Sequence, residues 1–148
     1  MTKKATKQPP ATGEELADAL VPVAFVTLAV LNKIGAENDL SLTLIRVLGI
    51  LWDRRPRMTE LADYLGLEKQ TMSGLISRAE KRGLVARAPN AADGRATDVF
   101  LTSEGVKLVR RLRSQGKQAL APLVDHLSPL DQKNLGELLQ RMLKTRKD

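Results

Sequence analysis

The sequence predicts a mainly α-helical fold that carries one small β hairpin. Apolar residues recur at three- and four-residue steps through most of the chain, the spacing of helices with one buried face. Two short apolar stretches, residues 84–87 and 97–101, flank the turn-like run PNAADGRA and are typical of paired strands. A chain of 148 residues is long enough for one domain with its own core and a helical appendage.

The N-terminal part comprises a polar arm and a very apolar helix. Residues 1–12 are basic and contain a pair of prolines, so we expect a disordered arm. The following helix, within residues 13–38, is apolar on nearly every side and has to be buried on several of them. In so small a chain, we expect a partner subunit to cover it. Pro22 is expected to kink or break this helix near its first turns.

Three shorter helices are expected in the centre of the chain, each with typical end signals. Thr59 is the expected N-cap of the second one. Gly66 and Gly83 suit the turns that follow the second and the third. These helices are expected at residues 41–53, 59–65 and 69–82.

Two more helices are expected after the hairpin. Thr102 is the expected cap of a helix that ends near Leu127. Ser128, Pro129 and Asp131 then combine a cap, a first-position proline and a carboxylate that reaches back, which together indicate a new helix start.

Composition restricts the chemistry of the chain. A formal net charge of +7 and a pI of about 10.0 favour a polyanionic partner, either nucleic acid or an anionic membrane surface. Because there is no cysteine, disulfides, thiolate catalysis and cysteine-bound metals are excluded, and a single histidine, His126, leaves no clustered metal ligands. The sequence has no phosphate-binding loop, dinucleotide motif or nucleophile paired with a base. We therefore expect neither an enzyme nor a cofactor.

The most apolar stretch, residues 19–31, is shorter than the roughly 18–20 residues that a membrane-spanning helix needs. Pro22 interrupts it, and the acids before it, Glu14, Glu15 and Asp18, do not fit a signal peptide. We therefore expect a soluble cytoplasmic protein without a membrane partner.

The helix predicted at residues 69–82 has one apolar and one polar face. Met72, Leu75, Ile76 and Ala79 are expected to point into the core. The polar side chains are types that bind base edges and phosphates in a DNA groove, and acids are nearly absent from that face. The residues of this helix that we expect to contact DNA are Lys69, Gln70, Thr71, Ser73, Gly74, Ser77, Arg78 and Lys81.

Gly74 lies inside this helix, where glycine costs roughly 1 kcal/mol relative to alanine. Two explanations are open. Either the helix approaches DNA closely at this point, or it packs tightly against the preceding helix.

The order helix, helix, turn, helix, strand, loop, strand is that of a winged helix-turn-helix. Residues 40–112 resemble the core of the MarR family, the multiple-antibiotic-resistance type of bacterial regulator. The matching stretches are MTELADYLGLEKQTMSGLISRAEKRGLVAR and the wing PNAADGRATDVFLTSEG. Asp93 and Arg95 match the D-x-R of the family's wing, and residues 101–105 match its closing L-T-x-x-G.

The resemblance implies roles for the wing residues. The wing tip enters the minor groove, where Arg95 is the inserted cation. Asp93 would hold the Arg95 guanidinium by a charge-assisted hydrogen bond, and Arg87 would meet a phosphate. The wing departs from the family pattern at Asn90, where an aspartate is common, and at Asp98, where an apolar residue is usual.

The resemblance also implies a domain organisation. Residues 40–102 form the expected DNA-binding domain, residues 13–38 the N-terminal dimerisation helix, and residues 103–148 the helices that complete the dimerisation region. A two-fold homodimer would bind double-stranded DNA at an inverted-repeat operator with half-sites roughly 10 base pairs apart. We expect a bacterial, nucleoid-associated regulator, and specifically a repressor that a small molecule releases.

Many members of the family bind an aromatic or carboxylate compound between the dimer arms and the winged domain. By residue type, Phe25, Arg46 and Trp52 are the expected ligand contacts, and His126 is a further candidate. Phe25 and Trp52 are more often core residues, and Arg46 suits a salt bridge equally well.

Alternatives from other functional classes are open. A winged helix that binds DNA without sequence preference, or one that contacts only protein, would need no ligand response. Gln70, Ser73 and Arg78 on the polar face argue against a purely protein-binding role. A metal-sensing winged-helix repressor would need ligands that this chain lacks.

Overall fold

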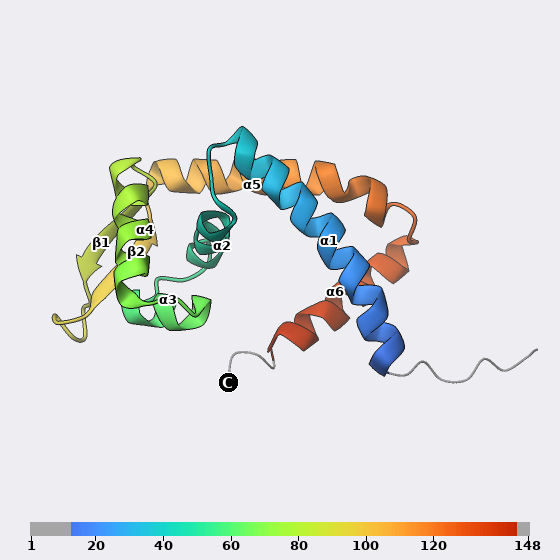
Figure 1. Ribbon diagram of the computed structural model, residues 1–148, viewed down its shortest axis with the longest axis horizontal. Helices are drawn as coiled ribbons and strands as arrows, with labels where there is room; N and C mark the ends of the chain where they lie inside the picture. The colour runs from blue at the N-terminus through green and yellow to red at the C-terminus, as the bar shows by residue number, and fades with distance from the viewer. Residues whose placement is uncertain (1–12, 145–148) are drawn as a thin grey trace, which may run out of the picture.

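The computed structural model describes residues 13–144, and the predicted arm at residues 1–12 lies outside them. Within this part of the chain the elements follow the predicted order (Figure 1). The helices are α1 (Gly13–Glu37), α2 (Leu42–Leu51), α3 (Met58–Leu65), α4 (Lys69–Lys81), α5 (Ser103–Val124) and α6 (Pro129–Lys144), and the strands are β1 (Val85–Pro89) and β2 (Thr97–Leu101).

The molecule has a compact end and an open end (Figure 1). Helices α2, α3 and α4 and the β hairpin form the compact end, and α5 runs from the hairpin toward α1 and α6. Every element of the compact end contributes to the core, so this end holds the largest fully buried side chains. They are Val47, Leu48, Leu61, Met72, Ile76, Val85 and Val99. The predicted fold class, mainly helical with a small β wing, is confirmed.

Two of the predicted helix caps are confirmed. Thr102 Oγ1 accepts a hydrogen bond from the backbone N–H of Gly105 at 3.1 Å, at the start of α5. Ser128 Oγ accepts one from the N–H of Asp131 at 3.2 Å, at the start of α6. Each hydroxyl satisfies an amide that has no partner within its own helix.

The predicted start of α3 at Thr59 is wrong. The helix begins at Met58, and Arg57 precedes it with extended backbone. The Glu60 carboxylate accepts a hydrogen bond from the N–H of Arg57 at 3.0 Å, so an acid in the first turn replaces the expected hydroxyl cap. Gly66 ends the helix with a positive φ of 67°, as predicted.

Residues 54–57, the RRPR sequence, extend the β hairpin on the side of β2. β1 and β2 pair with each other in antiparallel register. On the other edge of β2, the N–H of Val99 donates to the carbonyl of Pro56 at 3.0 Å, and a backbone bridge joins Arg57 to Asp98. We call residues 54–57 the arginine segment, because it gives β2 a second backbone neighbour.

Helix α1 differs from the sequence prediction in two respects. It continues through Pro22 without a break. At 25 residues it is also long and apolar enough to cross a membrane by length and composition, so the predicted shortness is wrong. Only 11% of its most apolar window is buried in the single chain. Most of the apolar surface of α1 is therefore exposed within the described residues, although its C-terminal end packs into the core at Ile34.

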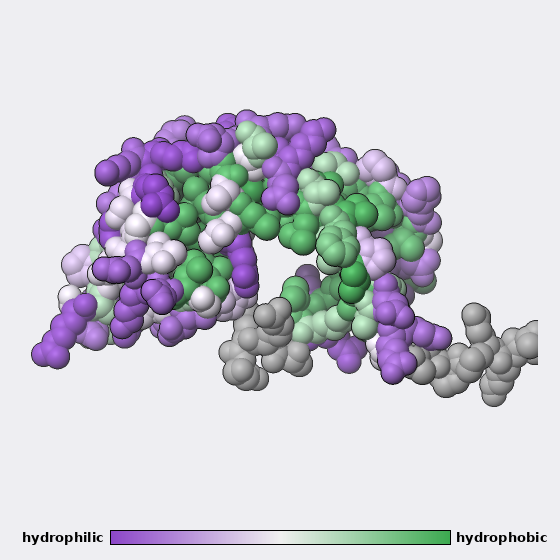
Figure 2. Space-filling view, viewed as in Figure 1, coloured by the Kyte–Doolittle hydropathy of each residue, from purple (hydrophilic) through white to green (hydrophobic). Residues whose placement is uncertain are grey.

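The exposed apolar surface is concentrated on α1 and α6. Figure 2 shows this surface as a continuous region at the open end of the molecule, whereas the wing and the outer side of α5 are hydrophilic. An exposed apolar surface of this extent is typical of a protein interface. Its large residues are Leu16, Val21, Val23, Phe25, Val26 and Leu28 of α1 and Leu130, Leu135, Leu138, Leu139, Met142 and Leu143 of α6.

Candidate nucleic-acid interface and effector pocket

Helix α4 presents the two faces that its sequence predicts. Met72, Ile76 and Ala79 are 0% exposed and anchor the helix in the core, and Leu75 is half-buried against them. The opposite face is accessible and carries the residues expected to contact DNA. Of these, Lys69, Gln70, Thr71, Arg78 and Lys81 are exposed or half-exposed, and Ser73, Gly74 and Ser77 are half-buried. The helix can therefore enter a major groove without leaving the core.

Arg87 joins the base of the wing to α4. Its Nη2 donates to Ser77 Oγ at 2.7 Å, and its Nε lies 3.4 Å from Glu80 Oε2. These contacts fix β1 relative to the second half of α4, a role that the sequence analysis did not predict. Contact between Arg87 and a phosphate stays a prediction.

The wing tip differs from the predicted geometry. Asp93 Oδ1 accepts a hydrogen bond from the backbone N–H of Arg95 at 3.1 Å, and Asp93 Oδ2 lies 4.0 Å from Arg57 Nη1. The prediction that Asp93 holds the Arg95 guanidinium is therefore wrong, because the carboxylate shapes the turn backbone instead. Within residues 13–144 the Arg95 side chain has no hydrogen bond or ion pair, and it is exposed.

Asn90 organises the turn and explains why an amide stands where an aspartate is common. Its Oδ1 accepts hydrogen bonds from the N–H groups of Ala92 and Asp93, both at 3.0 Å. Its Nδ2 donates to Asp98 Oδ1 at 2.8 Å. An ionised aspartate at position 90 has no proton to donate and would place two like charges together. Asn90 and Asp98, which both depart from the family pattern, are thus hydrogen-bonded to each other.

Asp98 is a charged residue, yet it is only 7% exposed, and among the described residues it is the one charged side chain that is buried. Its Oδ2 lies 3.5 Å from Arg55 Nε, and the Arg55 guanidinium lies 4.0 Å from the centre of the Phe100 ring. Arg55 was not among the residues expected at the site. An acid next to the apolar residues Val99 and Phe100 of the strand was the signal for a nearby cation, and the RRPR run supplies it.

The space around Gly74 decides between its two explanations. A Cβ on Gly74 would have only Arg78 Nη1 within 4 Å, at 3.6 Å, which is an ordinary contact. Tight packing against the preceding helix is therefore excluded. Close approach of Gly74 to DNA stays a prediction.

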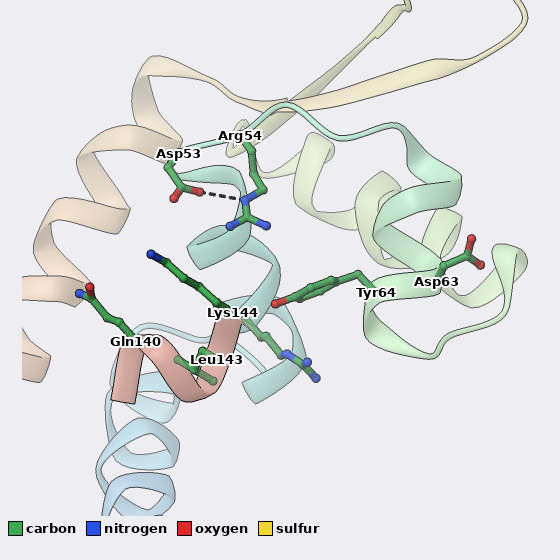
Figure 3. Close-up of a pocket in the computed structure, with 8 residues that line it drawn as sticks. Asp53, Arg54, Asp63, Tyr64, Gln140, Leu143 and Lys144 are labelled. Carbon is green, nitrogen blue, oxygen red and sulfur yellow. Dashed lines mark hydrogen bonds and ion pairs between the residues drawn. The ribbon is translucent and has the colours of Figure 1, made fainter. Parts of the chain in front are cut away.

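A pocket of about 780 Å³ lies between the compact end and the C-terminal turn of α6 (Figure 3). The Arg46 guanidinium lies 5.7 Å from the centre of the Tyr64 ring, and Arg54 is paired with Asp53 at 3.1 Å. Lys144 adds a third cation. An aromatic ring beside several cations suits an anionic aromatic molecule. The lining residues are Arg46, Asp53, Arg54, Asp63, Tyr64, Gln140, Leu143 and Lys144.

The structure does not bring the predicted ligand contacts together. Arg46 lines this pocket. Trp52 is half-buried in a separate, smaller pocket, where the Arg113 guanidinium lies 5.4 Å from its ring centre. Phe25 is 68% exposed on the apolar face of α1, and His126 is exposed after the end of α5. The pocket residues that sequence analysis missed come from distant parts of the chain, and no local signal marks them. Residues 13–144 contain no cluster of possible metal ligands.

An anchored α4 with an exposed polar face, next to a wing with an exposed arginine at its tip, defines a winged helix-turn-helix DNA-binding protein. The chain belongs to the MarR family, whose sequence profile matches residues 38–96. The transcriptional regulator HosA of Escherichia coli O157:H7 is 31% identical to this chain over an alignment of 99 residues. The alignment covers 60% of this chain and 73% of HosA. The chain is therefore a DNA-binding transcriptional regulator of that family.

Solved structures have the same fold. A mutant of MepR from a multidrug-resistant S. aureus clinical isolate superposes with a TM-score of 0.78 at 21% identity, over 94% of this chain and all of that one. NadR in complex with 4-hydroxyphenylacetate gives a TM-score of 0.71 at 20% identity, over 92% of this chain and 96% of NadR. A second MepR mutant, bound to an oligodeoxyribonucleotide, gives 0.62 at 21% identity, over 89% of this chain and 98% of that one.

Replacing Gly74 with alanine is predicted to stabilise the fold and weaken DNA binding. The new methyl group fits within the chain, so the free energy of unfolding rises by up to about 1 kcal/mol. Binding loses about 1–3 kcal/mol, the range for one good base contact. Urea denaturation and DNA titration measure the two effects. Gly49→Ala in α2, where a Cβ meets nothing within 4 Å, should stabilise the fold without changing DNA affinity. Unchanged DNA affinity of Gly74→Ala would contradict the assignment.

Proposed function

We propose that this chain is a homodimeric, sequence-specific repressor that a small molecule releases from double-stranded DNA. The observation that carries the proposal is the exposed polar face of α4 beside a wing tip where the Arg95 side chain has no hydrogen bond or ion pair within residues 13–144. A transcriptional regulator of this family works where the DNA is, so we assign it to the cytoplasm of a bacterial cell, on the nucleoid.

The DNA-binding part consists of α4 and the wing. The polar face of α4 would lie in the major groove, with Gln70 and Arg78 suited to base edges and Lys69 and Lys81 suited to phosphates. Arg95 at the wing tip would enter the adjacent minor groove, whose negative potential attracts an unpaired cation. The complex of a MepR mutant with an oligodeoxyribonucleotide supports this assignment, because that chain has the same fold.

The dimerisation region is proposed to consist of residues 13–38 and 103–148. The large apolar residues of α1 and α6 are exposed in the single chain, and no residue of α6 is buried. A second copy that covered these faces would remove a large apolar area from water. Two-fold symmetry would then place the two α4 helices in successive major grooves, so that the dimer reads an inverted repeat.

The effector is proposed to be a small aromatic carboxylate that binds in the pocket of Figure 3. Arg46 and Lys144 are cations without an ion-pair partner among the described residues, and the Tyr64 ring offers a stacking surface. NadR, which has the same fold, is seen in complex with 4-hydroxyphenylacetate, a compound of this class. Release from DNA would require the effector to bind one dimer conformation more tightly than the other.

Binding to a fluorescent duplex from the gene's own upstream region, compared with a scrambled duplex, tests the proposal. Arg95→Ala is predicted to weaken specific binding by about 1–3 kcal/mol and to leave the fold intact, because the side chain makes no hydrogen bond or ion pair within residues 13–144.

Lys81→Ala should weaken binding equally on both duplexes and lower the salt slope by about 1. Fluorescence anisotropy at several salt concentrations measures both effects.

Arg111→Ala is the matched control, because Arg111 is an exposed arginine of α5. It should leave specific binding unchanged. Equal affinity of the parent chain for upstream and scrambled duplexes would favour the alternative, a winged helix that binds DNA without sequence preference. Equal affinity of Arg95→Ala and the parent would reject the wing assignment.

Leu138→Asp is predicted to yield a monomer, because it places a charge in the apolar face of α6, where Leu138 is 50% exposed. Analytical ultracentrifugation gives the mass, and DNA affinity should fall with it, since one subunit reaches only one half-site. Lys133→Asp, at an exposed polar position of α6, should leave the dimer intact. A monomeric parent chain would contradict the homodimer.

Arg46→Gln is predicted to abolish the effector response while the affinity for DNA stays that of the parent. A panel of aromatic acids that includes 4-hydroxyphenylacetate is added to the preformed DNA complex, and anisotropy follows release. The matching uncharged amides should not release the DNA, because the cations of the pocket select a carboxylate. Release of the Arg46→Gln complex at the same concentrations would assign the effector to another site.

A further inference from the structure

We propose that Asp98 and Arg55 are positioning residues of the wing, which hold Arg95 in the orientation that binds DNA. The inference deepens the proposed function and rests on it, because it takes the wing to be a DNA-contacting element. Neither residue belongs to the polar face of α4 or to the D-x-R pair of the wing.

A chain of contacts leads from the arginine segment to the wing tip. Arg55 Nε lies 3.5 Å from Asp98 Oδ2, and Asp98 Oδ1 accepts a hydrogen bond from Asn90 Nδ2 at 2.8 Å. Asn90 Oδ1 accepts from the N–H of Asp93 at 3.0 Å. Asp93 Oδ1 in turn accepts from the N–H of Arg95 at 3.1 Å. Each residue therefore fixes the next one, and the last contact sets the backbone from which the Arg95 side chain projects.

The arginine segment also holds the wing at two further points. The N–H of Val99 donates to the carbonyl of Pro56 at 3.0 Å, so β2 is bonded on both of its edges. Arg57 Nη1 lies 4.0 Å from Asp93 Oδ2, which makes a second charge contact to the turn. A hairpin of two strands alone is marginally stable and free to swing, and the arginine segment, as the second backbone neighbour of β2, restricts that motion.

Stability alone does not explain a carboxylate at position 98. Burying a carboxylate is costly, and an apolar residue would pack in the strand at lower cost. The Arg55 side chain is 52% exposed, so water weakens its attraction to Asp98. The carboxylate fixes the orientation of the wing relative to the arginine segment, because one of its oxygens contacts Arg55 and the other accepts from Asn90. Such a group is expected to select one conformation.

Simple electrostatics and positioning predict effects of opposite sign. Asp98 is a negative charge in a DNA-binding element, so its neutralisation alone would strengthen attraction to a polyanion. If Asp98 positions the wing, its neutralisation weakens binding, because the ion pair that ties the wing to Arg55 is lost and the tip can take other orientations. The direction of the change therefore separates the two effects.

The experiment is a double-mutant cycle on the full chain with the labelled upstream duplex. The variants are Asp98→Asn, Arg95→Ala and the two combined. Asparagine keeps the size of the side chain and can still accept from Asn90, so the fold is retained, and thermal unfolding verifies this. Glu104→Gln is the charge control, because Glu104 is an exposed acid of α5 that pairs with Lys107 at 2.9 Å.

We expect Asp98→Asn to weaken specific binding roughly tenfold, within the range for directly coupled groups. In the Arg95→Ala background the same substitution should change affinity by less than about twofold, because there is no wing cation left to position. Glu104→Gln should leave binding unchanged or slightly tighter. A purely structural role for Asp98 would lower affinity equally in both backgrounds.

Equal or tighter binding by Asp98→Asn would overturn the inference, and so would an effect that is additive with Arg95→Ala. If Asp98→Asn does not fold, Arg55→Gln replaces it in the cycle, because Arg55 is half-exposed and tolerates truncation. Loss of this cation weakens binding to DNA by itself, so only the coupling to Arg95→Ala is then the criterion. The two levels of failure are distinct. If Arg95→Ala itself binds like the parent, the proposed wing function fails. If only Asp98→Asn and Arg55→Gln bind like the parent, the positioning role alone fails.

Discussion

Burial of the apolar face of α4 is the interaction on which the rest of the DNA-binding surface depends. Met72, Ile76 and Ala79 are fully enclosed, so the helix cannot rotate without exposing apolar area to water. The polar face is thereby held toward the outside. The wing is held in a fixed position relative to α4 by Arg87 of β1, which donates a hydrogen bond to Ser77 of α4 at 2.7 Å. The packing of the core therefore also determines how the DNA-binding surface is oriented.

The arginine segment connects the proposed effector pocket with the wing. Arg54 lines the pocket of Figure 3, and the residues directly after it, Arg55 and Pro56, contact β2. The pocket and the wing therefore share one short stretch of backbone. A link between effector binding and DNA binding needs such a shared element.

The sequence was most informative where structure depends on near neighbours. The two faces of α4 follow from helical spacing, and the wing strands follow from their flanking turn. Predictions failed where a side chain has several possible partners within reach. Asp93 accepts from the Arg95 backbone N–H and does not pair with its guanidinium. At the start of α3, the carboxylate of Glu60 takes the place of the expected Thr59 cap. Pocket residues such as Tyr64 come together only through tertiary packing, which periodicity does not encode.

Hydroxyl-radical footprinting of the parent chain on its upstream duplex would show whether two recognition helices and two wings bind the DNA together. We expect two protected tracts about one helical turn apart, related by two-fold symmetry, each flanked by protection of the minor groove where the wing enters. Loss of only the minor-groove protection in Arg95→Ala would assign that contact to the wing tip. A single tract, or uniform protection without a fixed position, would contradict a dimer that reads DNA with paired recognition helices and wings.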